Sequence, residues 1–380
     1  MKILYHHRTA AADGQYVHIR ELTEALESLG HEIIFVGPGR QRYRKMGSGG
    51  ARKKEPGRMM RAVRELLELG YTLPAFLRLW RGWLRHKPDI LYERANLFFP
   101  AGLWLKRLVG IPYLLEVNAP LTEERSRHGT LIWQRLARRT EQAIWRGADQ
   151  CFPVTNVLAD YLRQAGVPEE RITVLHNGVS DLFLNPKPVP APVAGIEGRI
   201  VLGFTGFLRD WHGLERVLEM IAEQGGPLDL HFVIVGDGPA KPAVEADVAR
   251  MGIEDRVSFT GIVQREDIAA YIAQFNIALQ PDVVAYASPL KLFEYMALEK
   301  PVVAPDTPNI GEVLQHNQNA RLFPQGDENA FCVQVEELAL DRALRERLGK
   351  AARQTILDDD YTWLGNARAV AQVGQDLQAS

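Results

Sequence analysis

The feature that most limits how this chain can fold is an alternation of short apolar strands with amphipathic helices, which occurs twice. The first run predicts strands at 3–6, 32–36, 89–92, 113–116, 150–154 and 172–175, with helices near 15–29, 97–109, 132–146 and 157–164. The second run predicts strands at 200–204, 231–235, 257–259, 277–279, 302–304 and 321–323, with helices including 214–223, 243–251 and 266–274. Repeated strand–helix units predict parallel, doubly wound sheets that bind ligands at the carboxyl ends of their strands.

A proline-dense segment separates the two runs. Residues 185–198 include Asn-Pro-Lys-Pro-Val-Pro-Ala-Pro, which excludes a helix interior and a central strand. We therefore predict an α/β protein of two doubly wound, Rossmann-like domains, residues 1–184 and 199–360, joined by a linker at 185–198. The domains are expected to face each other across a cleft with one ligand on each side. The last segment, 361–380, contains Trp363 and is expected to return to the first domain as a helix.

Composition excludes several other classes of protein. The chain has 380 residues and a formal net charge of -2, so it is not a general binder of polyanions. Cys151 and Cys332 lie far apart in the sequence and do not suggest a disulfide framework. The sequence shows no secretory signal, and no apolar run approaches the roughly 20 residues that span a bilayer. We expect a cytoplasmic protein, either soluble or bound to the inner face of the cell membrane.

The strongest chemical signal lies in the segment 288–297. Ser288 is a good N-cap and Pro289 suits a first helical position, so a helix is expected from here to about residue 299. The free N–H groups and the dipole at its start favour an anion, and a bound phosphate would remove the conflict between that dipole and Lys291. Glu294 follows one turn later on the same face. This pattern predicts a nucleotide-sugar site; an ordinary surface pair of Lys291 and Glu294 is the alternative.

Glycines mark two other turns between a strand and a helix. Gly236 and Gly238 allow close approach of the backbone to a ligand, although glycine at such a position often only makes the turn. The dinucleotide fingerprint G-x-G-x-x-G is incomplete because Lys241 stands at its last position, so a simple NAD site is not supported. Gly14, after Asp13, opens the first helix and either faces the donor phosphates or is an ordinary turn glycine.

A third junction, residues 204–213, displays charged side chains just before a helix. Arg209 can form a fork of hydrogen bonds to a diphosphate, and a solvated loop arginine is the alternative. A single loop histidine such as His212 is more often incidental than catalytic.

Two basic stretches suit an interface. Residues 40–64 are rich in arginine and lysine with several glycines, and residues 76–85 interleave Trp80 and Trp83 with arginines. Trp133 and Trp145 repeat this pattern. Such helices can lie on anionic lipid, and a solvated basic face is the alternative. Nucleic acid is a weaker interpretation because no binding motif accompanies the charge. No metal-binding cluster is apparent, and the acidic run 358–360 is expected to favour the start of the last helix.

Taken together, these motifs resemble the retaining glycosyltransferases of group 1, or family 4, which have the GT-B fold. The resemblance covers nearly the whole chain and rests on residues 13–14, 174–179, 233–239, 257–261 and 288–297. It implies that Glu294 binds the ribose and that Lys291 meets the diphosphate. It also implies that backbone N–H groups near Pro289 and Leu290 face the sugar or the phosphates.

The chain departs from the pattern of this family at three places. Tyr286 stands where an acidic residue is usual, eight positions before the glutamate. The usual Gly-Arg-Leu with a later lysine is replaced by the segment 206–208 and by His212, and Arg209 is the candidate to take over the lost charge. Asn118 stands where a histidine often follows a strand.

The expected function is that of a metal-independent, retaining glycosyltransferase of the hexosyltransferase type. It would move a sugar from a nucleotide diphosphate sugar, its co-substrate without further cofactor, to a glycan or lipid-linked acceptor in cell-surface polysaccharide or glycoconjugate synthesis. The catalytic candidates are Arg209, Lys291 and Glu294. The binding candidates are Gly14, His212, Gly238, Ser288, Pro289 and Leu290 for the donor, and Glu93, Arg94 and Asn118 for the acceptor. A non-catalytic GT-B subunit of a partner transferase and a sugar-nucleotide epimerase are the alternatives.

Overall fold

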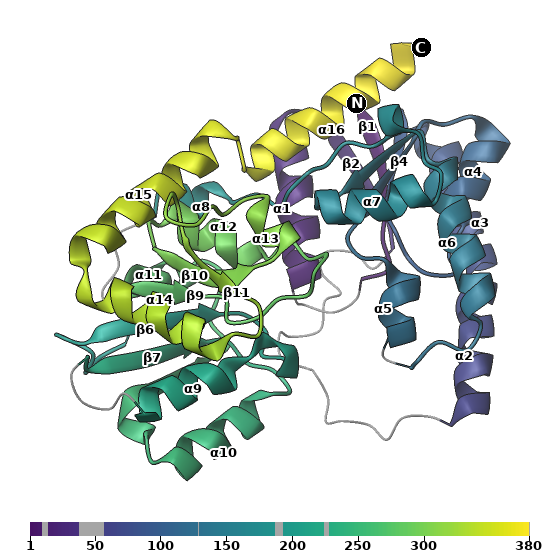
Figure 1. Cartoon of the computed structure of the whole chain (residues 1–380). Helices are drawn as coiled ribbons and strands as arrows, with labels where there is room; N and C mark the ends of the chain where they lie inside the picture. Colours follow the sequence, from purple (N-terminus) through teal and green to yellow (C-terminus); the bar gives the residue numbers. More distant parts are fainter. Residues whose placement is uncertain (10–13, 38–56, 128, 187–192, 224–227, 380) are drawn as a thin grey trace. The chain divides into compact units, whose positions relative to one another are not determined.

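The protein folds into two compact α/β units, each described here by itself. The computed structural model describes residues 1–9, 14–37, 57–127, 129–186, 193–223 and 228–379. Among these residues, the first unit contains everything up to His176 and everything from Trp363 onward, and the second contains Asn177 to Thr362 (Figure 1). No helix within the described ranges is long and apolar enough to cross a membrane.

The first unit is built on a five-stranded parallel sheet in the order β2-β1-β3-β4-β5. Its strands are β1 (Lys2–His6), β2 (Glu32–Val36), β3 (Ile90–Arg94), β4 (Tyr113–Val117) and β5 (Gln150–Pro153). Its helices are α1 (Gly14–Ser28), α2 (Arg58–Gly70), α3 (Thr72–His86), α4 (Ala101–Val109), α5 (Leu121–Arg127), α6 (Gln134–Gly147), α7 (Asn156–Gln164) and α16 (Trp363–Ala379). The helix α16, at the yellow end of the chain in Figure 1, packs on α1.

The second unit has a six-stranded parallel sheet in the order β11-β10-β9-β6-β7-β8. Its strands are β6 (Ile200–Thr205), β7 (Leu230–Val235), β8 (Val257–Gly261), β9 (Ile277–Leu279), β10 (Val302–Asp306) and β11 (Arg321–Pro324). Its helices are α8 (Asp181–Leu184), α9 (Leu214–Glu223), α10 (Lys241–Met251), α11 (Ile268–Ala273), α12 (Leu290–Ala297), α13 (Pro308–Gly311), α14 (Glu328–Leu340) and α15 (Arg342–Asp358). The strand order reverses between β6 and β9, which is where doubly wound sheets bind ligands.

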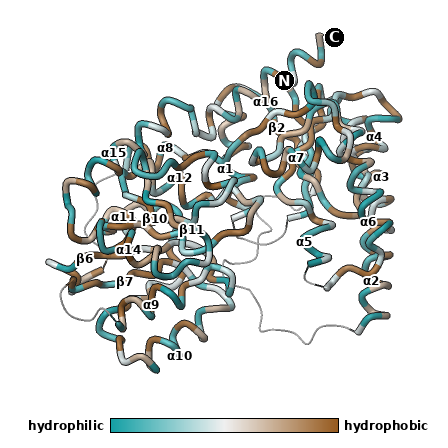
Figure 2. The backbone as a smooth tube through the Cα atoms, in the orientation of Figure 1, coloured by the Kyte–Doolittle hydropathy of each residue, from teal (hydrophilic) through white to brown (hydrophobic). Residues whose placement is uncertain are grey.

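Alternating apolar residues place one core on each face of the second sheet. Leu202 and Phe204 of β6 pack in one cluster, and Val201 packs in the other with residues of α12. Because parallel sheets are covered on both faces, their strands are mostly apolar, as the brown colouring along much of β6 and β7 shows (Figure 2). These two sheets confirm the predicted α/β class and the doubly wound topology.

Two details of the prediction differ from the structure. The segment 172–175 does not form a regular strand, although it follows β5: Ile172 makes an isolated bridge to Cys151, and the N–H groups of Thr173 and Leu175 donate to the carbonyls of Cys151 and Pro153. The boundary also differs, since the units divide at His176 rather than after residue 184. The reason is that Val179 and Phe183 are buried in a core of the second unit. The linker residues 187–192 lie outside the described ranges.

Candidate functional site

The strongest candidate site lies at the start of α12 in the second unit. The helix begins at Leu290, with Pro289 in the N-cap position, and no side chain among the described residues caps it. The prediction that Ser288 is the cap is therefore wrong. Its hydroxyl instead accepts a hydrogen bond from the backbone N–H of Asn177 at 3.3 Å, and its carbonyl accepts one from the Asn177 side chain. The uncapped first turn leaves backbone N–H groups available to an anion.

Lys291 places a buried ammonium group beside this helix start. Its Nζ is buried without a hydrogen-bond partner among the described residues and lies 3.7 Å from the centre of the Phe204 ring. Burial lowers the pKa of Lys291 to about 7, against the opposing effect of Glu294. Gly206 makes room for the side chain, because a Cβ there would lie 3.2 Å from Nζ. An unpaired, buried cation of this kind is suited to binding an anion.

The alternative of an exposed pair between Lys291 and Glu294 does not hold. Glu294 is 6% exposed, and its carboxylate accepts a hydrogen bond from the guanidinium of Arg265. That guanidinium also lies 4.8 Å from the centre of the Phe183 ring. Arg265, in the segment after β8, was missed in the sequence, since nothing in the local pattern pairs it with a glutamate 29 residues later.

His212 stands close to Lys291, since both contact the Phe204 ring. The centres of the His212 and Phe204 rings are 4.9 Å apart. The backbone N–H of Arg209 donates to Nδ1 of His212 at 3.1 Å, and burial, with the charges of Lys291 and Arg209, lowers the pKa of His212 to about 2. The imidazole is therefore neutral, with its proton on Nε2. The Arg209 side chain is exposed and its guanidinium lies 4.6 Å from the Phe207 ring centre.

The glycines after β7 are explained by packing between two loops. A Cβ on Gly236 would lie 2.0 Å from the carbonyl oxygen of Gly206, and a Cβ on Gly238 would lie 2.2 Å from that of Leu208. Backbone hydrogen bonds from Gly206 to Val235 and from Leu208 to Asp237 hold the loops together. Gly238 thus serves the shape of the loop that carries Arg209 and His212, which is the turn-making alternative considered for it.

A tyrosine of α12 fixes the helix to the end of β6. The hydroxyl of Tyr295 accepts a hydrogen bond from the backbone N–H of Thr205 at 2.7 Å, and both residues are buried. This bond sets the position of α12 relative to Gly206, and so the depth at which Lys291 lies. In the sequence, a tyrosine within an apolar helix does not indicate that its hydroxyl bonds to the end of a distant strand.

The acceptor candidates of the first unit fall on two faces of its sheet. Arg94 and Asn118 both donate hydrogen bonds to the carboxylate of Glu116. Glu93 is 1% exposed, and its carboxylate accepts a hydrogen bond from the Tyr113 hydroxyl at 2.9 Å. On the same face, the carboxylate lies 2.7 Å from Nδ1 of His6. Because successive side chains of a strand alternate, the structure brings Arg94 and Asn118 together and places Glu93 elsewhere, in a structural network.

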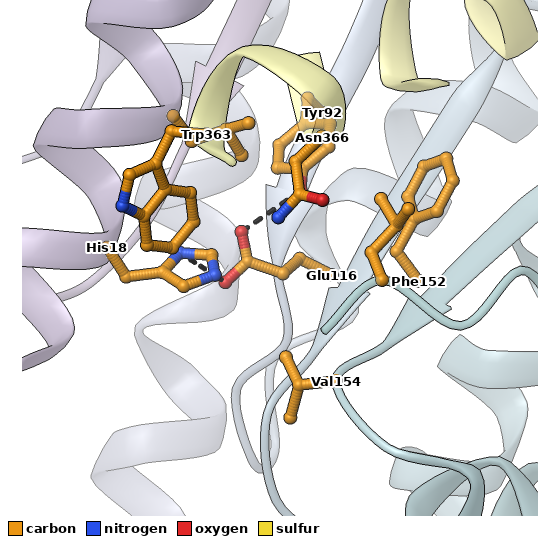
Figure 3. A pocket seen from close by; sticks show the side chains of 9 residues that line it. His18, Tyr92, Glu116, Phe152, Val154, Trp363 and Asn366 are labelled. Atoms are coloured by element: carbon orange, nitrogen blue, oxygen red, sulfur yellow. Dashed lines mark hydrogen bonds and ion pairs between the residues drawn. The ribbon is translucent and has the colours of Figure 1, made fainter. Parts of the chain in front are cut away.

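Glu116 is the centre of a polar cluster that the sequence did not reveal. Figure 3 shows it facing His18 of α1, with Trp363 and Asn366 of α16 beside them. The Tyr92 hydroxyl donates to Glu116 at 3.0 Å. Burial lowers the pKa of His18 to about 4. Burial raises the pKa of Glu116, but the charges of His18 and Arg94, with hydrogen bonds from Asn118 and Tyr92, hold it below its usual value.

The remaining candidates give less information. Gly14 is the exposed first residue of α1, and Asp13 lies outside the described residues, as does the basic stretch up to residue 56. Tyr286 is partly buried in the segment before α12. In the described parts of the chain, no three His, Cys, Asp or Glu side chains are grouped so that they could hold a metal ion.

Solved structures with similar folds span almost the whole chain. HepE of Anabaena in complex with UDP has a TM-score of 0.75 at 16% identity, covering 99% of this chain and 100% of that one. Sucrose-phosphate synthase of Thermosynechococcus elongatus has a TM-score of 0.78 at 19% identity, covering 100% and 99%. These likenesses establish the predicted GT-B fold.

Curated relatives are similar over part of their length. The alpha-D-kanosaminyltransferase of Streptomyces kanamyceticus is 26% identical over 68% of this chain and 68% of its own. The putative colanic acid biosynthesis glycosyltransferase WcaL of Escherichia coli is 26% identical over 57% of this chain and 54% of its own, so the alignment spans about half of that relative.

Family models match most of both units. The model described as Glycosyltransferase Family 4 matches residues 12–181, and the model described as Glycosyl transferases group 1 matches residues 199–341. The second match contains β6, the loop with Arg209 and His212, and α12 with Lys291 and Glu294. This chain belongs to the group 1, family 4 glycosyltransferases of the GT-B fold and is a glycosyltransferase enzyme.

Proposed function

We propose that the protein is a metal-independent, retaining glycosyltransferase that uses a nucleotide diphosphate sugar and acts on a glycan or lipid-linked acceptor. The observation that carries this proposal is the buried Lys291 ammonium, without a partner among the described residues, at the uncapped start of α12. A diphosphate is the ligand that would satisfy both this cation and the N–H groups of the first turn.

In this proposal the donor diphosphate lies between α12 and the loop after β6. Lys291 and the exposed Arg209 stabilise the charge that develops on the leaving diphosphate, and so supply the positive charge for which other transferases use a metal. The neutral imidazole of His212 is proposed to donate a hydrogen bond from Nε2–H to the same diphosphate. Removing one such contact is expected to lower turnover by about 10²–10³-fold.

Glu294 is proposed to accept hydrogen bonds from the ribose hydroxyls, with Arg265 holding its carboxylate. Retention is proposed to follow from attack on the same face of the sugar from which the diphosphate leaves. The acceptor hydroxyl then forms the new bond to the anomeric carbon, and its proton passes to the leaving phosphate oxygen. Arg94 and Asn118 are proposed for the acceptor side, whereas the buried network around Glu93 favours a structural role for that residue.

The relatives suggest which substrates to try first. HepE was captured with UDP and with UDP-glucose, so uridine diphosphate sugars are the first donors to test. The Escherichia coli relative is named for colanic acid biosynthesis, which favours cell-surface polysaccharide or glycoconjugate synthesis. An anionic membrane on the cytoplasmic side belongs to the proposal, because lipid-linked acceptors are held in membranes.

The proposal is tested with a panel of UDP- and GDP-sugars and candidate acceptors, by measuring nucleoside diphosphate release and the anomeric configuration of the product. We expect activity that survives EDTA, a retained anomer, and the loss of turnover given above in Lys291→Ala. Lys350→Ala, an exposed lysine of α15, is the matched control. Full turnover in Lys291→Ala would contradict the site. Nucleotide binding without release would favour a non-catalytic subunit, and conversion of the donor without acceptor would favour an epimerase.

A further inference from the structure

The helix α2 turns its apolar side toward solvent. Its exposed apolar side chains, with their exposed fractions, are Met59 (83%), Met60 (64%), Val63 (47%), Leu66 (49%) and Leu67 (69%). At 100° per residue they fall within an arc of about 120°. An amphipathic helix on a soluble domain normally directs such an apolar stripe into the core. The outward orientation of α2 therefore has to be explained by its contacts and by what the exposed stripe binds.

The cause is that α2 is anchored by its acidic residues. Glu65 is 1% exposed, and its carboxylate accepts hydrogen bonds from the backbone N–H groups of Ile132 and Trp133, each at 2.8 Å. Glu68 forms an ion pair with Arg125 at 2.7 Å. Because these carboxylates face the protein, the opposite, apolar side of the helix is held outward.

The apolar stripe continues along α3. The exposed members there are Leu73 (58%), Leu77 (36%), Trp80 (37%) and Leu84 (47%), spaced as one face of a helix. The N–H of Tyr71 bonds to the carbonyl of Leu67 and the N–H of Ala75 to that of Tyr71, so helical hydrogen bonding continues across the junction. Together, the outward residues of α2 and α3 form what we call the α2–α3 face, about 40 Å long.

Arginines flank this stripe. Arg58, Arg64, Arg78, Arg81 and Arg85 are all exposed on the two helices. The two acidic residues of the segment 58–87, Glu65 and Glu68, are already engaged with the rest of the unit. Trp133 is 43% exposed beside α2, and its indole N–H donates to the carbonyl of Ala62. Arg64 forms an ion pair with Glu68 of its own helix, whereas Arg58, Arg78, Arg81 and Arg85 form no ion pair within the described residues. Apolar side chains, tryptophans and exposed arginines are the chemistry of a helix lying in the headgroup region of an anionic bilayer.

We propose that the α2–α3 face binds an anionic phospholipid surface, with its apolar side chains in the headgroup region and its arginines on lipid phosphates. The positive charge favours an anionic lipid surface over a second copy of this chain as the partner, since a second copy would bring the same arginines against one another. All of these residues belong to the first unit and none is in the α12 site. Vesicle binding and donor turnover can therefore fail separately.

The test uses the full chain and flotation with vesicles of phosphatidylcholine, alone or with about one-third phosphatidylglycerol. We expect binding to the anionic vesicles only, and weaker binding at high salt. The double variant Met59→Glu with Leu67→Glu should lower vesicle partitioning by at least about tenfold. Arg81→Glu with Arg85→Glu should remove the preference for anionic lipid. Leu340→Glu, an equally exposed leucine of the second unit (76%), is the control and should bind as the parent does.

Three outcomes would overturn the proposal. The first is unchanged vesicle binding in Met59→Glu with Leu67→Glu, whose melting temperature should equal that of the parent because both side chains are exposed. The second is equal binding to neutral and anionic vesicles. The third is a concentration-dependent dimer, seen by light scattering, that the same double variant disperses, because the face would then be an interface between copies.

Discussion

The Lys291 side chain is expected to lower the stability of the ligand-free protein and to strengthen the binding of an anion. Its ammonium is buried without a partner among the described residues, a state that costs free energy until an anion arrives. A lysine at a helix start looks like a surface residue in the sequence, so the position was predictable and the burial was not. That burial depends on Phe204 and Gly206, which lie more than 80 positions earlier.

The substitution Lys291→Met is therefore predicted to stabilise the ligand-free protein while it lowers turnover by about 10²–10³-fold. Methionine fills the same space without a charge, so the free energy of unfolding should rise by about 1–3 kcal/mol in urea titrations. The same variant should lose the rise in melting temperature that UDP gives the parent. A fall in stability together with a preserved UDP shift would contradict this role.

Proton uptake on donor binding is the second prediction at this site. Because burial lowers the pKa of Lys291 from its usual 10.5 to about 7, the folded protein binds fewer protons than the unfolded chain between those values. This group should therefore make stability rise with pH from about 7 to about 10.5. A bound diphosphate restores the proton, so UDP binding at about pH 8 should take up close to one proton and weaken as pH rises further.

Calorimetry in buffers of different ionisation enthalpy measures that uptake. The uptake should vanish in Lys291→Met, whereas Lys350→Ala should keep it. His212 is not expected to contribute, since its pKa near 2 leaves it neutral throughout this range. Uptake that persists in Lys291→Met would assign the proton to another group.

Arg265→Ala is predicted to destabilise the protein through Glu294. It leaves a carboxylate that is 6% exposed without its guanidinium, at a cost of about 3 kcal/mol. If Glu294 holds the ribose, KM for the donor should also rise. Arg250→Ala breaks an exposed pair with Asp247 and should change stability by at most about 1 kcal/mol, which makes it the matched control. Equal effects of both variants in urea titrations would contradict the argument.

At the scale of elements, the site depends on two loops that fit only without side chains. Gly236→Ala would place a Cβ 2.0 Å from the Gly206 carbonyl oxygen, in a backbone with φ of +135°. We predict a loss of about 2 kcal/mol or more, together with weaker UDP binding, because the displaced loop carries Arg209 and His212. Gly311→Ala has open space and an ordinary φ, and it should be nearly neutral in the same thermal and binding measurements.

The elements show where sequence patterns are informative and where they are not. Apolar strands such as β6 and β7 were placed within one residue, because burial on both faces leaves a clear apolar run. The cap of α12 was predicted wrongly, because Ser288 bonds to Asn177, more than 100 positions away, instead of to its own helix. Glu93 and Arg94 are neighbours in the sequence, and only the pleat of β3 separates their environments.

At the scale of the whole molecule, the chain leaves the first unit at His176 and returns to it at Trp363. The two crossing segments are bonded to each other, by Val179 to Tyr361 at 3.0 Å within the second unit and by Asn366 to His176 at 2.8 Å within the first. The sequence predicted two domains and a returning helix, since periodicity and proline content are local. It did not place the division, which depends on whether residues 177–184 find their core in one unit or the other.

This organisation predicts different behaviour for the two isolated pieces. Residues 177–362 should fold alone and give a cooperative thermal transition, because both of their ends lie together in one unit. Residues 1–176 should not, since they lack the helix that brings the buried Trp363, Ala367 and Val370. Adding a peptide of residues 363–380 should restore order in circular dichroism. A cooperative transition of residues 1–176 alone would contradict this expectation.

The place of α16 also sets an order of events during translation. The ribosome makes the first sheet early, but the helix that covers α1 and brings Trp363 beside His18 is synthesised only after the second unit. The nascent first unit therefore lacks one of its helices while the second unit is synthesised. The unit whose synthesis begins first can complete its fold only after the other has been made.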